Sequence, residues 1–259
     1  MKKIISIANQ KGGVGKTTTT VNLCTALAAT RKKTLLIDFD PQGNSSTSLG
    51  FDSRKRYPSI YELLTEQLPL KTICRQTLIP NLSIVTASED LAGFEVEFSQ
   101  DENRVSVLKR CLKDLDFDYI IIDCPPALGL LTLNALVASH SVIIPLQCEY
   151  FALEGLSQLL QTVKRVKKNY HPALTVQGIV LTMFDGRNAL NKAVVRDVRE
   201  TMRSMVYQTV IPRNVKLSEA PSHGKPALIY DMRSVGAQAY IRLAAEIIRQ
   251  ERKNNDKQS

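Results

Sequence analysis

A glycine-rich segment near the amino terminus, residues 11–17, has the composition of a phosphate-binding loop and reads KGGVGKT. Glycines let backbone N–H groups wrap around phosphate oxygens, because no Cβ atom obstructs the approach. An apolar β-branched run precedes the segment and a helical pattern follows it, so the positive amino end of a helix would face the bound anion. The segment consists of Lys11, Gly12, Gly13, Val14, Gly15, Lys16 and Thr17.

Three side chains at the end of this loop carry the expected contacts to a nucleoside triphosphate. Lys16 is expected to reach the β- and γ-phosphates, the Thr17 hydroxyl to bind Mg²⁺, and Thr18 to contact the α-phosphate. The general pattern G-x-x-x-x-G-K-[ST] begins with a glycine where this chain has Gln10, but the three glycines that follow leave the backbone free to curve. We therefore predict an ATP-hydrolysing enzyme with ATP and Mg²⁺ as its cofactors.

Two further apolar runs end in carboxylates suited to a metal site. The run 119–123 reads YIIID and ends at Asp123, in the position of a Walker B aspartate, which holds Mg²⁺ directly or through water. A strand-end aspartate that only caps the next turn is the alternative. The run 34–39 places Asp38 and Asp40 near its end, on the same side if the strand stays extended, with Asp38 in a supporting role.

Short β-branched runs alternate with longer helical patterns along the chain. Runs that are apolar throughout predict strands buried on both faces of a parallel sheet. The predicted strands are 3–8, 34–39, 82–86, 119–123, 141–145, 176–182 and 208–211. The predicted helices are 17–30, 57–67, 70–76, most of 90–115, 130–138, 153–169, 190–205 and 235–252.

This alternation predicts a single-domain α/β protein of the P-loop NTPase class, with a mostly parallel twisted sheet and helices on both faces. Residues 1–252 form the predicted ATPase domain, and residues 253–259 a polar carboxyl-terminal tail. In such sheets ligands bind beyond the carboxyl ends of the strands, which is where the glycine-rich loop, Asp40 and Asp123 would lie.

Composition favours a cytosolic protein over a membrane or secreted one. The opening apolar run 4–8 is too short for a signal peptide, and no stretch approaches the ~20 apolar residues of a membrane span. The five cysteines are odd in number and form no C-x-x-C pair. We expect them to be small core residues in a reducing compartment.

The positive charge is concentrated in the last hundred residues. Residues 1–159 contain 16 Lys and Arg against 17 Asp and Glu, a net charge of −1, whereas residues 160–259 contain 18 against 8, a net charge of +10. A basic face attracts polyanions such as nucleic acid or an anionic membrane, and a solvated basic surface is the alternative.

The loop K-G-G-x-G-K-T, with its extra lysine Lys11, resembles the deviant Walker A motif of the ParA/MinD ATPases. The resemblance implies a homodimer that sandwiches ATP, in which Lys11 reaches across the interface to the partner's nucleotide. It also implies that Asp40 orients or activates the attacking water, which suits a phosphoryl transfer that depends on positioning. Loops near 183–185 and 212–214 flank the adenine in this family, so Pro212 and Asn214 are the expected base contacts.

Longer segments resemble the ParA branch of the family, often called Soj, which partitions chromosomes and plasmids. They are 38–44, DFDPQGN; 123–126, DCPP; 182–185, TMFD; and 211–226, IPRNVKLSEAPSHGKP. This resemblance implies an ATP-dependent homodimer that binds double-stranded DNA without sequence preference and is associated with the nucleoid in the cytoplasm. It also implies a centromere-binding partner of the ParB type that stimulates hydrolysis and release.

A strip of basic side chains fits this DNA-binding role. In the predicted helix 190–205, apolar side chains recur at three- and four-residue spacing and form the inward face, while arginines recur on another face. Such a strip contacts phosphates without reading bases and gives salt-sensitive binding. The alternative is local pairing of the arginines with Asp197 and Glu200. The candidate DNA contacts are Arg187, Arg196, Arg199, Arg203 and Lys216.

Two other functions known among related ATPases are alternatives. A MinD-like regulator of division-site placement needs a terminal amphipathic helix with bulky apolar residues to bind the membrane, and none follows Ile248. An iron–sulfur reductase of the nitrogenase iron-protein type bridges a cluster with paired cysteines, and the surroundings of Cys124 and Cys148 do not resemble cluster loops. Because no bulky apolar residue follows Ile248, we expect no stable membrane association.

Overall fold

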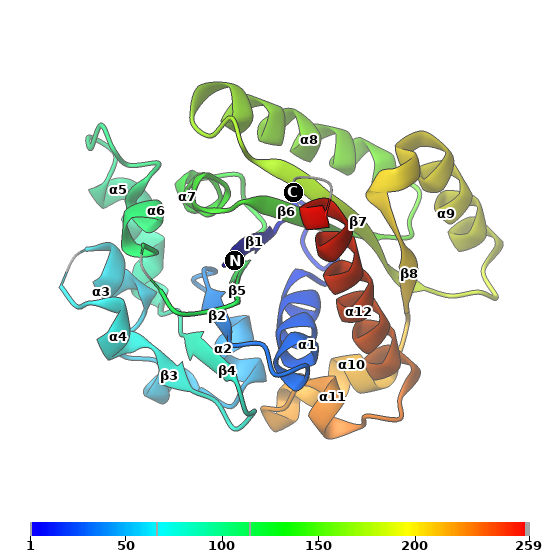
Figure 1. The fold of residues 1–259 in the computed structure, drawn as a ribbon, viewed down its shortest axis with the longest axis horizontal. Helices are drawn as coiled ribbons and strands as arrows, with labels where there is room; N and C mark the ends of the chain where they lie inside the picture. Colours follow the sequence, from blue (N-terminus) through cyan, green and yellow to red (C-terminus); the bar gives the residue numbers. More distant parts are fainter. Residues whose placement is uncertain (1, 66, 114, 257–259) are drawn as a thin grey trace.

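Eight strands form one twisted sheet in the order β3-β4-β2-β5-β1-β6-β7-β8 (Figure 1). The computed structural model describes residues 2–65, 67–113 and 115–256. Neighbouring strands run parallel except for the short edge strand β3, which is antiparallel to β4, so the predicted fold class is confirmed. The strands are β1 Lys3–Ile7, β2 Thr34–Asp38, β3 Arg75–Gln76, β4 Leu82–Val85, β5 Tyr119–Asp123, β6 Ser141–Gln147, β7 Thr175–Phe184 and β8 Val206–Pro212.

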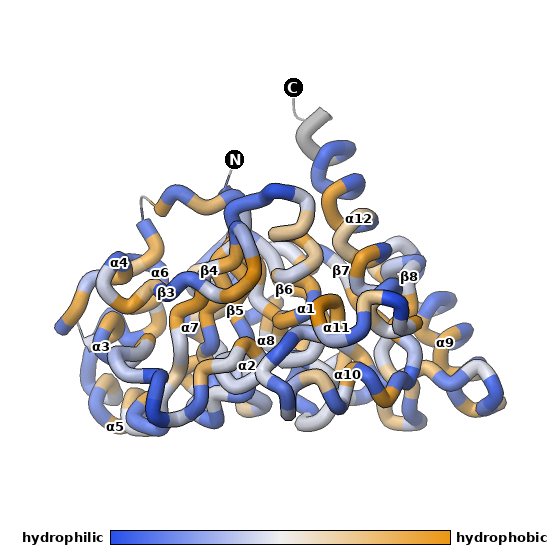
Figure 2. The backbone as a smooth tube through the Cα atoms, turned by 90° about the horizontal axis from the view of Figure 1, so that it is seen from below, coloured by the Kyte–Doolittle hydropathy of each residue, from blue (hydrophilic) through white to orange (hydrophobic). Residues whose placement is uncertain are grey.

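The central strands are buried on both faces, which explains why they read as continuous apolar runs. Every residue of β2 and β5 is buried. Side chains alternate between two cores: Ile120 and Ile122 of β5 belong to one hydrophobic cluster, and Ile121 belongs to the other. Figure 2 shows hydrophobic residues gathered in the strands at the centre of the molecule.

Helices cover both faces of the sheet, as predicted (Figure 1). On one face α1, Lys16–Ala29, packs beside the last helix α12, Val235–Asp256. On the other face lie α7, Leu130–Ala138, and α8, Ala152–Asn169. The remaining helices are α2 Asn44–Ser48, α3 Ile60–Leu64, α4 Leu70–Ile73, α5 Phe94–Glu97, α6 Val107–Cys111, α9 Ala189–Met202, α10 Val215–Glu219 and α11 Ala227–Tyr230.

The prediction that residues 90–115 are largely helical is wrong. The structure has a 3₁₀ turn at Glu89–Gly93 and two short helices, α5 and α6, in that segment. Asp101 interrupts the helical pattern, because its Oδ1 accepts a hydrogen bond from the Asn103 backbone N–H at 2.7 Å. An aspartate that bonds to the backbone two residues ahead stabilises a turn in place of a continuing helix.

Two other helix boundaries also differ from the prediction. The helix predicted at 57–67 begins only at Ile60, because Ser59 and Glu62 form a capping box that fixes its first turn. The helix predicted at 70–76 ends at Ile73, and the next residues pair with β4 as the edge strand β3.

The last two predicted helices end at different places as well. The helix predicted at 190–205 ends at Met202, because Arg203 has a φ of 45° and starts a separate 3₁₀ turn. The last helix continues to Asp256, so it includes the beginning of the predicted polar tail. Residues 257–259 of that tail lie outside the described residues.

The carboxyl ends of the central strands meet at one edge of the sheet. Asp38 at the end of β2 is in register with Asp123 at the end of β5, and Asp123 is in register with Ile7 at the end of β1. Farther along the same edge, Gln147 of β6 is in register with Thr182 of β7. The loops that leave these strands therefore lie side by side.

We predict that Gly178→Ala destabilises the fold by about 1–3 kcal/mol, since overpacking in a core has this cost. Gly178 lies in β7 beneath the buried Tyr207 ring, and an added Cβ would be 2.5 Å from Tyr207 Cε2. Urea denaturation followed by circular dichroism would measure the change. Gly155→Ala is the control, because its Cβ would meet nothing within 4 Å in α8 and should stabilise the helix. Equal stability of Gly178→Ala and the unsubstituted protein would contradict the packing argument.

Candidate functional site

The glycine-rich loop connects β1 to α1, as the sequence predicts, and its backbone is curved where glycine allows it. Gly13 and Gly15 have φ values of 73° and 88°, in the left-handed region that other residues rarely occupy. Two side chains hold the loop in place. The buried Asn9 amide accepts from the Lys11 N–H at 3.0 Å and donates to the Pro145 carbonyl at 2.7 Å.

A second anchor comes from the end of β7. The Thr182 hydroxyl donates to the Val14 carbonyl at 2.9 Å. The loop is therefore attached to both β6 and β7 by hydrogen bonds within the chain. A preformed loop of this kind presents backbone N–H groups to an anion without further rearrangement.

The two lysines of the loop have different surroundings. Lys16 is 7% exposed and donates to the Lys11 carbonyl at 3.2 Å. Burial lowers the pKa of Lys16, and the nearby carboxylates of Asp123 and Asp40 oppose this effect. Lys11 is half-exposed and forms an ion pair of 2.7 Å with Glu149, which follows β6. Lys16 thus points into the protein, whereas Lys11 is held at its surface.

Two carboxylates lie fully buried on the adjacent strand ends. Burial and the charge of the neighbouring Asp123 together raise the pKa of Asp38 to about 7, while hydrogen bonds from Ser46 oppose the rise. Burial also raises the pKa of Asp123 to about 6, while hydrogen bonds from Ser45 and Thr17 oppose the rise. Two buried carboxylates next to each other repel when both are ionised. This repulsion favours a cation at the site.

Hydroxyl groups from two helices hold these carboxylates. Ser45 donates to Asp123 Oδ2 at 2.7 Å, and Thr20 donates to Asp123 Oδ1 at 3.1 Å. Both the N–H and the hydroxyl of Ser46 donate to Asp38 Oδ2 at 2.7 Å. These hydroxyls could not be predicted from the sequence, because serine and threonine are common and only the fold places these three against the carboxylates.

Asp40 lies just beyond the end of β2 and lines a cavity, whereas Asp38 is not part of its lining. Its Oδ1 accepts from the Gln42 N–H at 3.1 Å. The cavity has a volume of about 470 Å³. Side chains expected at phosphate, metal and the attacking water meet in it: Lys16, Thr17, Thr18 and Asp40, with Gly12, Gly13 and Gly15 of the loop. Asp123, the other expected metal ligand, is fully buried and does not line the cavity.

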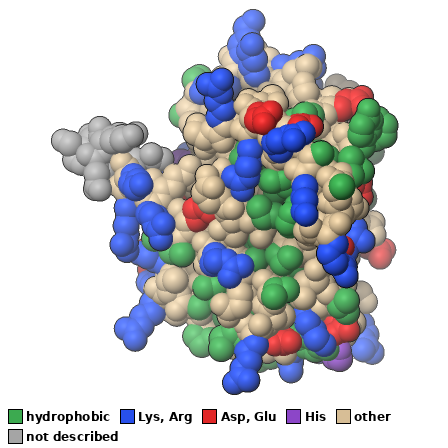
Figure 3. Space-filling view, turned by 90° about the vertical axis from the view of Figure 1, so that its right-hand side faces the viewer, with side chains coloured by type: hydrophobic (Ala, Val, Ile, Leu, Met, Phe, Trp, Pro, Cys, Tyr) green, Lys and Arg blue, Asp and Glu red, His purple; other side chains and the backbone are tan. Residues whose placement is uncertain are grey.

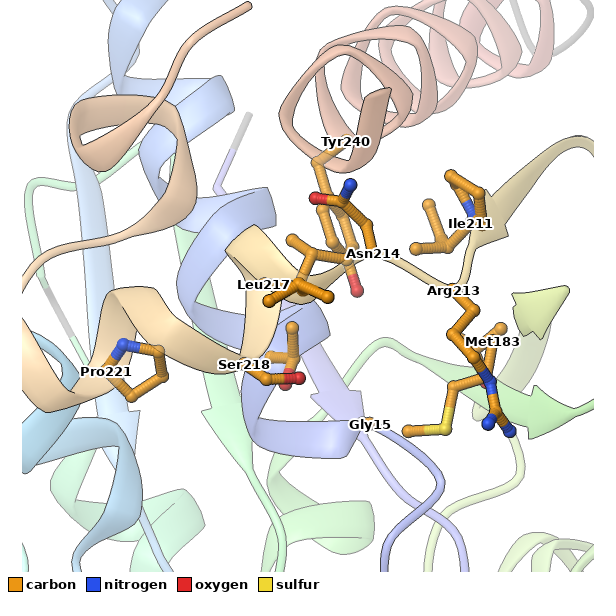
Figure 4. A pocket seen from close by; sticks show the side chains of 13 residues that line it. Gly15, Met183, Ile211, Arg213, Asn214, Leu217, Ser218, Pro221 and Tyr240 are labelled. Carbon is orange, nitrogen blue, oxygen red and sulfur yellow. The ribbon is translucent and has the colours of Figure 1, made fainter. Parts of the chain in front are cut away.

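A second cavity of about 530 Å³ adjoins the first (Figure 4). Gly15, Thr18, Met183 and Pro221 line both, so the two form one elongated site. In Figure 4 the side chains of Asn214, Leu217 and Tyr240 form one wall, and those of Met183 and Arg213 lie across from them. The second cavity is lined by Gly15, Thr18, Thr182, Met183, Ile211, Pro212, Arg213, Asn214, Val215, Leu217, Ser218, Pro221 and Tyr240.

Pro212 and Asn214, the predicted base contacts, both line this second cavity. The Asn214 Oδ1 is buried and has no hydrogen-bond partner. The oxygen lies next to Gly236 of α12, where a Cβ on Gly236 would be 3.0 Å from it, so it is packed against that helix. Tyr240 and Leu217 could not be predicted as lining residues, since they come from α12 and α10 and belong to no local sequence motif.

Among the described residues, no group of three or more His, Cys, Asp and Glu side chains is placed to hold a metal ion. A Mg²⁺ ion at Thr17 and Asp123 would therefore take its remaining oxygen ligands from phosphate and water, which is usual for this ion. The residues present fit a magnesium–nucleotide complex better than a free metal ion.

The candidate DNA contacts differ in their partners. Arg187 is largely exposed, and its guanidinium donates to Asp185 at 2.9 and 3.0 Å. Arg196 lies 3.6 Å from Asp197 and 4.0 Å from Glu200, so local pairing occurs at this residue. Lys216 pairs with Glu219 at 2.9 Å.

Arg199 and Arg203 also have distinct positions. Arg199 donates to the carbonyls of Tyr207 and Gln208 at 3.1 and 3.0 Å and so covers part of the edge strand β8. Arg203 is exposed in the turn after α9. Figure 3 shows Lys and Arg side chains scattered over the side of the molecule on which α9 and β8 lie.

Comparison with known proteins identifies the family. The chain matches the AAA domain family AAA_31 over residues 2–176. It is 49% identical over 254 residues to the chromosome partitioning protein ParA of Caulobacter vibrioides, with 96% of this chain and 95% of the relative covered. It is 52% identical over 249 residues to the sporulation initiation inhibitor protein Soj of Bacillus subtilis, with 95% and 98% covered.

Solved structures share the fold over nearly the whole chain. A cobyrinic acid a,c-diamide synthase from Mycobacterium smegmatis with bound ATP analog and magnesium has a TM-score of 0.85 at 36% identity, with 98% of this chain and 97% of that chain covered. The septum site-determining protein MinD from Pyrococcus horikoshii, complexed with Mg-ADP, has a TM-score of 0.79 at 29% identity, with 95% and 96% covered. Together with its own phosphate loop, these likenesses show that the chain belongs to the ParA/Soj family of chromosome-partitioning ATPases.

Proposed function

We propose that this protein is a DNA-partition ATPase that hydrolyses Mg²⁺-ATP as a homodimer. The elongated site carries the proposal, because it joins the glycine-rich loop to a second cavity that Pro212 and Asn214 line. We infer that the triphosphate occupies the first cavity and the base the second. The magnesium and nucleotide complexes of the structural relatives support this choice.

Each group at the site has a proposed role in holding the nucleotide. The loop N–H groups of residues 11–17 and the Lys16 ammonium bind the phosphates, and Thr18 contacts the α-phosphate. Thr17 and Asp123 hold Mg²⁺, which supplies charge stabilisation for the transferring phosphoryl group. Pro212 and Asn214 contact the base.

Asp40 is the proposed catalytic carboxylate. It faces the same cavity as Lys16 and Thr17, and it is 7% exposed. In this position its free carboxylate oxygen can accept a hydrogen bond from a water and orient that water toward the γ-phosphate. Lys16 would stabilise the charge that develops on the phosphate oxygens.

The surface beside Lys11 is the proposed dimer interface. Tyr150 and Phe151 follow Glu149, are 75% and 65% exposed, and pack edge to face. Exposed aromatic side chains next to a charged catalytic group are typical of a surface that another protein covers. We infer that a second copy of the chain covers them when ATP is bound, and that Lys11 then reaches the partner's nucleotide.

The basic side chains of the α9 region are the proposed contacts to double-stranded DNA. The net charge of +10 in residues 160–259 supports a polyanionic ligand. Arg187, Arg196, Arg199, Arg203 and Lys216 are the candidates. Since Arg199 already donates to backbone carbonyls of β8, we expect it to contribute less than the exposed Arg187. A centromere-binding partner of the ParB type would stimulate hydrolysis on the nucleoid in the cytoplasm.

A MinD-like function at the membrane is the second candidate, since MinD proteins share the fold. No helix among the described residues is long and apolar enough to span a membrane. The charge distribution and the sequence likeness to ParA and Soj favour DNA. Comparing binding to DNA and to anionic liposomes in the presence of ATP decides between the two functions.

We predict that Lys16→Ala lowers the affinity for Mg²⁺-ATP by about 100-fold or more, because a buried charge-assisted contact to phosphate is lost. Calorimetric titration with a non-hydrolysable ATP analogue would measure the loss. Lys33→Ala is the matched control, since Lys33 pairs with Asp116 and directly precedes β2, at the end of the strand away from the site. Unchanged affinity in Lys16→Ala would contradict the assignment of the phosphate cavity.

Asp40→Ala should lower turnover by about 100-fold or more while the ATP-bound dimer accumulates, because positioning of the water is lost and binding is kept. The rate of phosphate release would measure turnover. Light scattering after size-exclusion chromatography would measure the fraction of dimer. A variant that hydrolyses ATP at the normal rate would remove Asp40 from the mechanism.

Arg187→Glu should weaken DNA binding by about tenfold or more at moderate salt and leave ATP affinity unchanged, because it reverses one charge at the proposed interface. Fluorescence anisotropy with labelled duplex DNA, measured at several salt concentrations, would test this. Lys71→Glu is the control, because it makes the same charge change on the exposed side of α4, across the molecule from α9 (Figure 1). If both variants bind DNA equally well, the proposed DNA-binding face is wrong.

A further inference from the structure

A single buried side chain, Asn191, connects two loops that have different proposed tasks. Asn191 lies in the first turn of α9 and is 8% exposed. Its Oδ1 accepts from the Asp185 N–H at 2.8 Å, and its Nδ2 donates to the Cys148 carbonyl at 2.8 Å. One amide thus satisfies one backbone group in each loop.

The first of these loops contains the partner of Lys11. Cys148 directly precedes Glu149, whose carboxylate forms the 2.7 Å ion pair with Lys11. The Glu149 N–H also donates to the Gln147 carbonyl at 2.8 Å, so the backbone turns tightly here. Any change in the Lys11–Glu149 pair therefore acts on a short, hydrogen-bonded turn next to Cys148.

The second loop contains Arg187. Asp185 accepts from the Arg187 N–H at 3.0 Å and from its guanidinium, and these bonds hold the pKa of Asp185 at about 2. The same loop follows Met183, which has a φ of 53° and lines both cavities of the nucleotide site. The direction in which Arg187 points thus depends on backbone that Asn191 fixes through Asp185.

We propose that Asn191 is a positioning residue that couples the Glu149 loop to the Arg187 loop, so that release of Lys11 from Glu149 changes the DNA affinity of Arg187. This inference rests on the proposed function. Two loops joined by one buried amide move together, because separating them would leave a buried backbone N–H or carbonyl without a partner. Lys11 leaves Glu149 when it reaches the partner's nucleotide, and the released turn then shifts through Cys148 and Asn191.

The alternative is that Asn191 only stabilises the start of α9. Asn191→Asp separates the two roles, since a carboxylate can still accept from the Asp185 N–H but cannot donate to the Cys148 carbonyl. The control is Asn188→Ala, which removes the α9 cap that accepts from the N–H groups of Leu190 and Asn191 and does not contact Cys148. A merely structural role predicts the same behaviour in both variants.

The first measurement is the ratio of DNA affinities with a non-hydrolysable ATP analogue and with ADP. The ratio is informative because the added negative charge of Asn191→Asp lowers both affinities alike. We expect the ratio to fall at least about fivefold in Asn191→Asp and to stay near the normal value in Asn188→Ala, with ATP affinity and dimerisation unchanged in both. A normal ratio in Asn191→Asp would overturn the inference.

The second measurement is hydrogen exchange at residues 183–188, which needs no DNA. In the protein that retains Asn191, Glu149→Gln should raise hydrogen exchange at these amides, because it weakens the pair with Lys11. In the Asn191→Asp background the same substitution should have no effect there. Additive effects of the two substitutions on exchange would contradict coupling through Asn191.

The two measurements distinguish the possible failures. If the unsubstituted protein binds DNA equally with ATP and ADP while the exchange experiment shows coupling, the DNA function is wrong and the mechanical link stands. If DNA binding depends on ATP but neither the affinity ratio nor the exchange responds to Asn191→Asp, the proposed function stands and this inference fails.

Discussion

The site depends on the burial of two carboxylates on neighbouring strands. Asp38 and Asp123 are in register at the ends of β2 and β5, and both are fully buried. A pair of this kind is unfavourable when both groups are ionised, unless donors and a cation surround it. The hydroxyls of Thr20 and Ser45 and the N–H of Ser46 supply the donors. These contacts fix α1 and α2 to the strand ends and so determine where the phosphate loop lies.

The nucleotide cavity is closed by parts of the chain far apart in sequence. Most of the lining of the first cavity comes from the first 50 residues, with Pro126, Met183 and Pro221 added, whereas the wall opposite Met183 comes from α10 and α12 near the carboxyl terminus. The Tyr240 hydroxyl lies 3.1 Å from the Thr19 hydroxyl, which joins the last helix to the helix of the phosphate loop. The two cavities therefore belong to one packed unit, and this unit includes Met183 and the start of the Arg187 loop.

Lys11 illustrates how one residue can belong to two arrangements. In the single chain it pairs with Glu149 on the surface, and both side chains remain 46% exposed. An exposed ion pair is weak, so little free energy holds Lys11 in this position. A partner's phosphate would compete effectively with the Glu149 carboxylate, because the contact to phosphate is shielded from solvent in an interface. Weak pairing with Glu149 in the monomer would therefore allow Lys11 to move to the partner's nucleotide in the proposed dimer.

Features that depend on near neighbours in the chain could be predicted from the sequence. The phosphate loop, the parallel sheet and the strand-end position of Asp123 follow from glycines, β-branched runs and their spacing, which act over a few residues. Local pattern also misled: residues 90–115 have a helical pattern, but Asp101 closes a turn within it. The boundary of α9 was unpredictable for a similar reason, since Arg203 adopts a positive φ that arginine rarely favours.

Contacts between groups far apart in the chain could not be predicted, because they depend on the complete fold. The contact of Thr20 and Ser45 with Asp123, the cavity at Asn214 and the two bonds of Asn191 each join segments that are separated along the chain. Hydrogen bonds and burial depend on positions in space, and common residues such as serine and asparagine carry no mark of their partners. A local sequence pattern therefore locates the phosphate loop, whereas packing of the whole sheet and its helices completes the nucleotide site.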